Sequence, residues 1–280
     1  MFMSVISGID AIKKTVVYIY SGEAHGEQLT SVYPLGTGFF VSIPHHIQEG
    51  AIWPYFVTAK HVLERIPREY LAEIFLRVNL KGWSSSSNQT GVSFLRLPVL
   101  NGEENLQWTI HSNPAVDLAV IQRLPSLETY EFSSIPATMF DTNEVIQREG
   151  VAEGDEIFFP CFTPEIPQQR RNNPVIRFGK LALMLGEDIP TPEGSTKFHF
   201  AECFPFGGNS GSPVFLRFGP TRRPDQLVLG SERYFLLGIM KGHYGPSEIG
   251  HHIGIAAITP IIYLKEILDS ETLRRQRGEI

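Results

Sequence analysis

Small residues crowd around two serines in the segment FGGNSGSPVF, residues 206–215. Ser210 has glycine neighbours at positions 207, 208 and 211. Glycines gather where the backbone must approach another group closely or take dihedral angles that a Cβ would forbid. A serine nucleophile needs such a backbone, because the N–H groups beside it must point at the substrate carbonyl. An ordinary Gly/Ser/Asn hairpin loop has the same composition, so the segment alone leaves both interpretations open.

Acyl transfer by a serine also requires a base that takes its proton and an acid that orients the base. His61 is the best candidate for the base, since it follows the apolar strand and small residues of FVTAKHVL. Asp117 is the best candidate for the acid, because it lies in the apolar run NPAVDLAVIQ, where an unpaired charge would be costly. The plainer interpretations are a core or surface histidine, a turn aspartate and a loop serine.

The elements that would position these residues are mostly β-strands. Runs rich in Val, Ile, Phe and Tyr are separated by Gly, Pro and polar clusters, which indicates a sandwich or a barrel. Helical periodicity is clear only after Pro260, in a segment with one apolar side and a basic last turn, and a short helical turn is expected after residue 60. The expected strands are residues 15–20, 36–43, 52–59, 73–80, 117–124, 156–162, 177–185, 196–202, 212–218, 233–240 and 252–259.

The length of the chain permits one large β unit or two smaller ones. Its 280 residues, 42% of them hydrophobic, are enough for a sizeable core. Residues 125–150 form the least regular segment and separate two groups of strands, so they are expected to connect two β units. Residues 81–91, KGWSSSSNQTG, are expected to form a mobile hairpin loop.

Charge and composition exclude several classes of partner. The formal net charge is −6 and there is no basic stripe, so no nucleic acid partner is expected. No apolar run reaches the roughly 18–20 residues that span a bilayer, and the start of the chain lacks the pattern of a signal peptide. Cys161 and Cys203 are too few for a disulfide framework. We therefore expect a cytoplasmic protein with two inert thiols and no membrane contact.

The three candidate groups carry a family resemblance. The motifs TAKH, DLAV and GNSGSP, in the order His, Asp, Ser and separated by 56 and 93 residues, resemble those of chymotrypsin-like serine proteases. The closer likeness is to the bacterial trypsin-like branch, with its glutamyl endopeptidases and HtrA-type protease domains. The resemblance implies two six-stranded antiparallel β-barrels. Residues 1–135 would form the barrel with His61 and Asp117, residues 136–259 the barrel with Ser210, and residues 260–280 a closing helix.

The resemblance also implies an activity and a role for each residue. It makes Ser210 the nucleophile, His61 the general base and then acid, and Asp117 the orienting carboxylate of a serine endopeptidase. The backbone N–H groups of Gly208 and Ser210 would form the oxyanion hole. The reaction would pass through an acyl-enzyme, act on a polypeptide substrate and need no cofactor.

Substrate preference is expected to depend on a second set of residues. Phe204, six residues before the serine, would lie near the base of the primary specificity pocket. The strand with Met240, Lys241 and Gly242 would form the wall of the pocket and pair with the substrate backbone. Met240 stands where glutamyl endopeptidases carry a specificity histidine. A small or medium apolar P1 residue is expected, while Lys241 and His243 keep an acidic P1 residue as the second choice.

Departures from the family pattern bear on control of the activity. Asn209 replaces the Asp that pairs with a newly cut N-terminus in digestive enzymes, so zymogen activation of that type is not expected. Lys60 stands where a small residue is usual, and no PDZ-like segment follows residue 260. Control by a regulatory protein partner is therefore expected.

Other functions compete with an active protease. The same fold could bind a partner segment without cutting it, and the same triad could serve an esterase. The histidine pairs His45–His46 and His251–His252 are not expected to bind a metal, because neighbouring side chains in a strand point to opposite faces.

Overall fold

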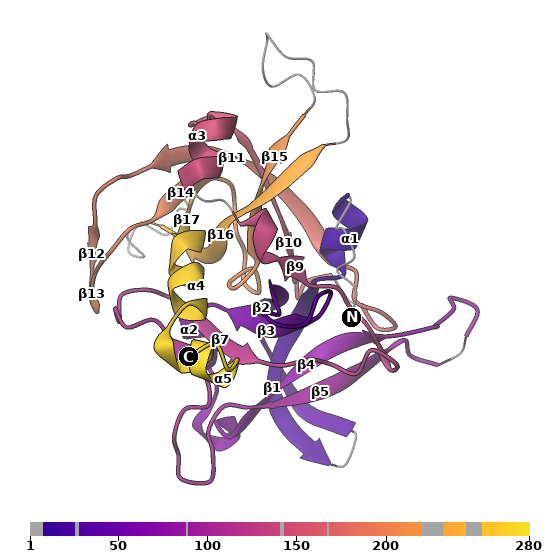
Figure 1. The fold of residues 1–280 in the computed structure, drawn as a ribbon. Helices are drawn as coiled ribbons and strands as arrows, with labels where there is room; N and C mark the ends of the chain where they lie inside the picture. The colour runs from indigo at the N-terminus through magenta and orange to yellow at the C-terminus, as the bar shows by residue number, and fades with distance from the viewer. Residues whose placement is uncertain are drawn as a thin grey trace.

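Two β structures make up the protein. The computed structural model describes residues 8–25, 28–87, 89–140, 143–166, 168–219, 232–244 and 254–280, and all the helices and strands named below lie within these ranges. An N-terminal sheet and a C-terminal barrel lie one below the other in Figure 1. The expectation of a mostly β fold with a helical C-terminal segment is confirmed.

The N-terminal sheet has nine strands, with main order β5-β4-β1-β2-β3-β7-β6, while β8 pairs with β4 and β9 with β2. The expectation of six strands in a closed barrel differs in detail, because β6, β8 and β9 are only two residues long and leave no pattern in the sequence. The strands are β1 (Val16–His25), β2 (Gln28–Pro44), β3 (Ile52–Thr58), β4 (Glu73–Leu80), β5 (Val92–Pro98), β6 (Thr109–Ile110), β7 (Ala119–Gln122), β8 (Tyr130–Glu131) and β9 (Ile135–Pro136).

The C-terminal strands close into a six-stranded antiparallel barrel with order β10-β11-β14-β17-β16-β15. A separate two-stranded hairpin, β12–β13, projects from the connection between β11 and β14 (Figure 1). The strands are β10 (Glu156–Cys161), β11 (Val175–Met184), β12 (Ile189–Thr191), β13 (Gly194–Thr196), β14 (His199–Glu202), β15 (Pro213–Phe218), β16 (Arg233–His243) and β17 (Ile255–Pro260).

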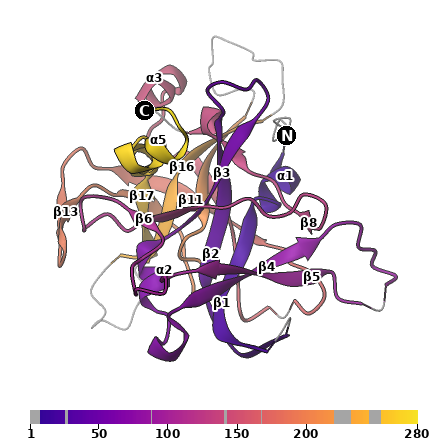
Figure 2. The ribbon, with the colours of Figure 1, turned by 60° about the horizontal axis from the view of Figure 1, so that its bottom comes forward.

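Helices are short and lie around the β structures. The α-helices are α1 (Ile9–Lys13), α2 (Lys60–Glu64), α3 (Asn143–Glu149), α4 (Ile261–Leu268) and α5 (Glu271–Gln276), with 3-10 turns η1 (Arg68–Tyr70) and η2 (Ala137–Met139). The helical turn expected after residue 60 is α2, which lies against β2 (Figure 2). Within the described ranges no helix is long and apolar enough to cross a membrane.

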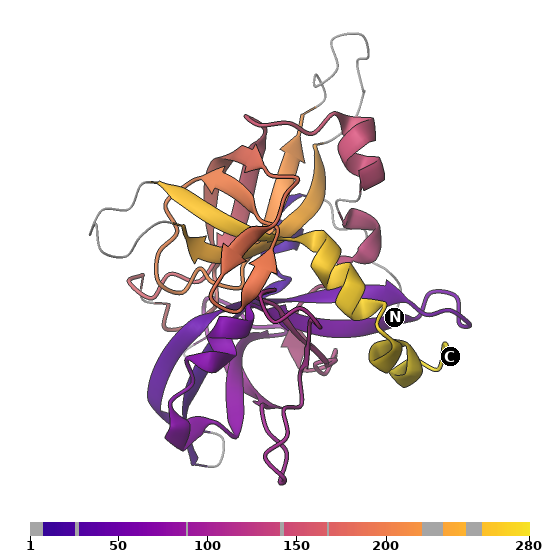
Figure 3. The same ribbon diagram turned by 90° about the vertical axis from the view of Figure 1, so that its left-hand side faces the viewer.

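The C-terminal segment is two helices instead of the single helix expected over residues 260–280. The chain leaves α4 at Asp269, and the hydroxyl of Ser270 then accepts a hydrogen bond from the N–H of Leu273 at 3.5 Å. Serine at this position caps a helix, so α5 begins anew in a different direction. Figure 3 shows α4 crossing beside the junction of the two β structures, with α5 below it.

One hydrophobic core joins the two halves. Val57 and Val120 of the sheet, Phe158 and Phe215 of the barrel, and Leu264 of α4 belong to the same buried cluster. The rings of Phe158 and Phe215 stack with centroids 5.3 Å apart. Separate clusters fill the inside of the sheet and the inside of the barrel. This shared packing fixes the halves relative to each other.

Adding a side chain at Gly238 would test how tightly the barrel is packed. A Cβ there would lie 2.2 Å from the carbonyl oxygen of Thr259 in the neighbouring strand. We expect Gly238→Ala to lower the free energy of unfolding by at least about 2 kcal/mol, measured by urea denaturation. Gly186→Ala is the control, since nothing lies within 4 Å of its Cβ, and it should change the stability by less than about 0.5 kcal/mol. Equal effects would contradict this account.

The pH dependence of stability should report the burial of His199 in β14. Burial lowers the pKa of this ring from 6.5 to about 4, and its Nδ1 has no hydrogen-bond partner in the described part of the chain. The unfolded chain binds a proton below about pH 6.5, whereas the folded protein does not until about pH 4. Stability should therefore fall by on the order of 3 kcal/mol as pH drops from 6.5 to 4. His199→Gln should lack this loss in urea titrations, and an unchanged slope would refute the assignment.

Candidate active site

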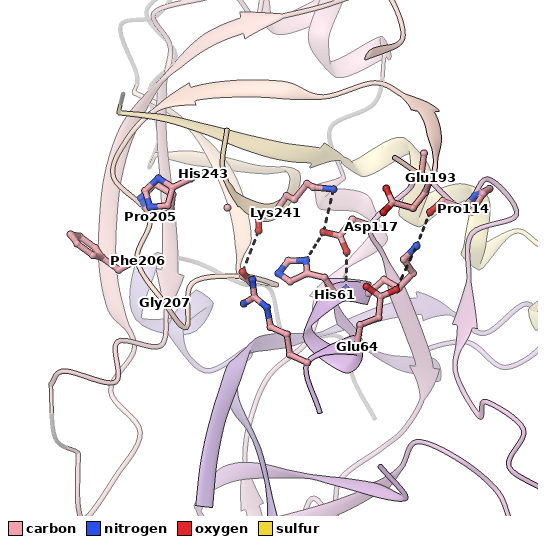
Figure 4. Close-up of a pocket in the computed structure, with 15 residues that line it drawn as sticks. His61, Glu64, Pro114, Asp117, Glu193, Pro205, Phe206, Gly207, Lys241 and His243 are labelled. Atoms are coloured by element: carbon pink, nitrogen blue, oxygen red, sulfur yellow. Dashed lines mark hydrogen bonds and ion pairs between the residues drawn. The ribbon is translucent and has the colours of Figure 1, made fainter. Parts of the chain in front are cut away.

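A cavity of about 470 Å³ opens between the two halves (Figure 4). Its walls come from α2, the loop before β7, the β12–β13 hairpin, the loop before β15, and β16. His61, Asp117 and Ser210 all line it. The structure thus brings the three predicted catalytic side chains into one cavity from both halves of the chain.

Strand pairing explains why His61 and Asp117 meet. β3 and β7 are antiparallel, with Thr58 opposite Ala119. The chain continues beyond Thr58 into α2, which carries His61, and it arrives at Ala119 from Asp117. In an antiparallel pair the end of one strand lies beside the start of the other. The residues that follow β3 and those that precede β7 therefore lie at the same edge of the sheet.

Asp117 holds His61 by two hydrogen bonds. Nδ1 of the imidazole lies 2.6 Å from Oδ2 of the carboxylate, and the backbone N–H of His61 donates to Oδ1 at 2.9 Å (Figure 4). The carboxylate is 4% exposed. Burial by itself raises the pKa of Asp117, but the bonds from His61 and the charges of His61 and Lys241 outweigh it and bring that pKa below its usual value. The carboxylate is therefore ionised, so Nδ1 of His61 must be the donor.

Ser210 lies beside this pair with its hydroxyl directed elsewhere. The Oγ–H donates to the backbone carbonyl of Lys241 at 3.2 Å. The Nε2 atom of His61 is buried and has no hydrogen-bond partner in the ranges that the structure describes. Oγ of Ser210 and Nε2 of His61 therefore share no hydrogen bond in this arrangement.

The loop before β15 is held by both halves of the molecule. The backbone N–H of Thr37 in β2 donates to the carbonyl of Ser210 at 2.9 Å, and the N–H of Gly211 donates to that of Met240 at 2.9 Å. Gly211 has φ +85°, and a Cβ there would lie 2.1 Å from the carbonyl oxygen of Thr37. Only glycine fits this contact, which explains one of the crowded glycines.

Thr37 also fixes the position of Gly208. Its hydroxyl donates to the Gly208 carbonyl at 2.6 Å and accepts from the N–H of Phe162 at 3.0 Å. The Asn209 amide donates to the Phe162 carbonyl at 2.8 Å, and its oxygen accepts from the N–H of Phe206. The N–H groups of Gly208 and Ser210 donate to no acceptor among the described residues. Sequence reasoning missed Thr37, although a threonine between two strand glycines in GTGFF was a usable signal.

Only some of the residues expected to set specificity line the cavity. Lys241 and Gly242 line the cavity, whereas Met240 is fully buried in the barrel core. Successive side chains on a strand face opposite sides, so Met240 points inward when Lys241 faces the cleft. Phe204 is 55% exposed and lies outside the cavity wall, against the backbone of Gly254.

Several cavity residues were not anticipated. Glu64 comes from α2, Arg65 from the C-cap of that helix, Pro114 from the loop before β7, and Glu193 from the tip of the β12–β13 hairpin. The hairpin is docked by the Asn113 amide, which donates to the Ser195 carbonyl at 2.8 Å. None of these positions has a sequence signal, because each reaches the cleft only through long-range packing.

The described residues contain no metal-binding group. No cluster of three or more His, Cys, Asp or Glu side chains arranged for a metal occurs in these ranges. The rings of His45 and His46 stack on each other, whereas His251–His252 lie outside the described residues. Cys161 and Cys203 are free and buried, and burial raises the pKa of each thiol to about 11.

Solved structures share this architecture. No protein-family model and no curated protein matches the sequence. The MamO protease domain from Magnetospirillum magneticum is similar at a TM-score of 0.50, is 15% identical, and is matched over 93% of this chain and 98% of that chain. The Drosophila Grass clip serine protease of the Toll pathway is similar at a TM-score of 0.50 and is 12% identical. The match covers 98% of this chain and 74% of that chain. The likeness shows a chymotrypsin-like fold.

Replacing Thr37 should loosen the loop around Ser210. Thr37→Val keeps the shape of the side chain but leaves the buried N–H of Phe162 and the Gly208 carbonyl without a partner. We expect a loss of roughly 2 kcal/mol in urea denaturation, whereas Thr37→Ser keeps the hydroxyl and should cost at least about 1 kcal/mol less. The bonds do not hold the loop if the valine variant is as stable as the serine variant.

Proposed function

We propose that the protein is a serine endopeptidase that hydrolyses peptide bonds through Ser210, His61 and Asp117. The observation that carries the proposal is the buried carboxylate of Asp117, which accepts bonds from the ring and the main chain of His61 beside Ser210. Such a carboxylate orients the imidazole and stabilises the imidazolium that forms when the base takes a proton.

Substrate would bind as an added strand along β16. β15 pairs with β16 as far as Ile239, opposite Pro213, and Met240 still exchanges backbone hydrogen bonds with Gly211 and Ser212 just before β15. The carbonyl of Lys241 lies just beyond this point and holds the Ser210 hydroxyl. An extended peptide that pairs here would offer an N–H to that carbonyl and place its own carbonyl near Oγ.

Acylation begins when the Ser210 hydroxyl turns to Nε2 of His61. Oγ attacks the peptide carbonyl while its proton passes to Nε2, and the oxyanion accepts bonds from the N–H groups of Gly208 and Ser210. His61 then gives the proton to the leaving amine, the C–N bond breaks, and an ester on Ser210 remains. Water repeats the sequence in deacylation, with His61 as base and then acid. The carboxylate of Asp117 stays ionised throughout.

Substrate preference and control remain predictions. Pro205, Phe206 and Gly207 line the cavity beside Ser210, which favours a small or medium apolar P1 residue. His243 lines the same wall, so an acidic P1 residue is kept as the second choice. A regulatory protein partner would explain how such an activity is restrained.

A catalytically silent binding scaffold is the second candidate. One observation favours it. The Ser210 hydroxyl donates a hydrogen bond to the Lys241 carbonyl, while Nε2 of His61 has no hydrogen-bond partner among the described residues. If the hydroxyl cannot leave this position, the cleft would bind a peptide strand without cutting it.

A fluorophosphonate probe separates these functions. We expect mass spectrometry to find the probe on Ser210 and Ser210→Ala to lose at least about a thousandfold in peptide hydrolysis. Ser212→Ala is the matched control, because that hydroxyl is fully buried without a hydrogen-bond partner in the described residues, and labelling at Ser210 should persist.

A folded protein that takes up no label would instead support the scaffold. Casein and short p-nitrophenyl esters would be compared in the same assays, because an esterase would cleave only the esters. A digest of a peptide library would then report the P1 preference.

A further inference from the structure

Lys241 contacts the same carboxylate oxygen as the candidate base. Its Nζ lies 3.8 Å from Oδ2 of Asp117, the atom that Nδ1 of His61 approaches to 2.6 Å (Figure 4). The ammonium also lies 5.2 Å from the ring centre of Phe198, which helps to hold it over the cleft. The side chain is 34% exposed and that of Asp117 is 4% exposed, so water screens this contact only partly.

Other charged groups face the cleft without touching this carboxylate. Within the described residues, His61 and Lys241 alone form ion pairs with Asp117. Lys60 is directed away from it, since its Nζ binds the Pro114 carbonyl at 2.6 Å and lies 3.8 Å from Glu64. The remaining charged or titratable groups of the cavity are Arg65 at the C-cap of α2, Glu193 on the hairpin and His243 on β16.

Two cations that share one carboxylate oxygen compete for its charge. The carboxylate favours a protonated imidazole, because opposite charges attract strongly where water is scarce. An ammonium on the same oxygen neutralises part of that charge and also repels the imidazolium directly. The cost of adding a proton to His61 is therefore higher with Lys241 in place than with Asp117 alone.

We propose that Lys241 is a positioning residue of this site that opposes protonation of His61 through the carboxylate that the two side chains share. The inference rests on the proposed function for its catalytic meaning, while the charge competition itself does not depend on activity. The side chain contacts Asp117, and its backbone carbonyl holds Ser210. A single residue of β16 thus touches the acid and the nucleophile.

The test is the pH midpoint at which the His61 ring takes up a proton, followed by NMR in the Ser210→Ala background and assigned by its loss in His61→Gln. Lys241→Met should move this midpoint upward by roughly half to one pH unit, because the opposing charge is gone. Lys241→Arg should restore it. Lys180→Met removes one positive charge from a surface lysine outside the cavity and should leave the midpoint in place.

The same variants, with Ser210 intact, give the activity readout. Lys241→Met should shift the acidic limb of the kcat/KM profile upward by the same amount, roughly a three- to tenfold loss below the midpoint. An unmoved His61 midpoint in folded Lys241→Met and Lys241→Gln would overturn the proposal. A moved midpoint in a protein that takes no fluorophosphonate label would uphold the charge competition and reject the protease function.

Discussion

A carboxylate buried at the junction of two β structures is the constraint around which this site is organised. Asp117 can remain ionised at 4% exposure only because each of its oxygens has a partner. One oxygen takes the main-chain N–H of His61, and the other takes the imidazole with the Lys241 ammonium nearby. These groups come from α2 and from β16, so satisfying one buried charge fixes the first half of the chain against the second.

The position of Ser210, the candidate nucleophile, depends on the same junction. Thr37 reaches from β2 to the Ser210 carbonyl through its N–H and to Gly208 through its hydroxyl, while the Thr58 hydroxyl donates to the Thr37 carbonyl at 2.8 Å. These polar links lie beside the shared core that joins the sheet, the barrel and α4. Small shifts between the halves would break buried hydrogen bonds as well as packing, so the geometry of the cleft is strongly specified.

Much of the fold could be read locally from the sequence. The expected strands at 36–43, 52–59, 73–80 and 212–218 correspond to β2, β3, β4 and β15, because their apolar periodicity is a local property. The break in the C-terminal helix and the β12–β13 hairpin were not anticipated. Ser270 begins a new helix inside a pattern that remains amphipathic, and the hairpin is docked on Asn113 from the other half of the chain.

By itself, the sequence determined the three candidate groups and their order, since a buried carboxylate needs a partner and crowded glycines mark close backbone contact. Tertiary structure alone decided how these groups meet. The register of β3 and β7 brings His61 to Asp117. The alternation of side chains along β16 buries Met240 and turns Lys241 toward the cleft. The hydroxyl of Ser210 donates a hydrogen bond to the carbonyl of Lys241 in that same strand. The register of a strand, and with it the face on which each side chain lies, is set by pairing between distant segments. A local sequence pattern does not contain that information.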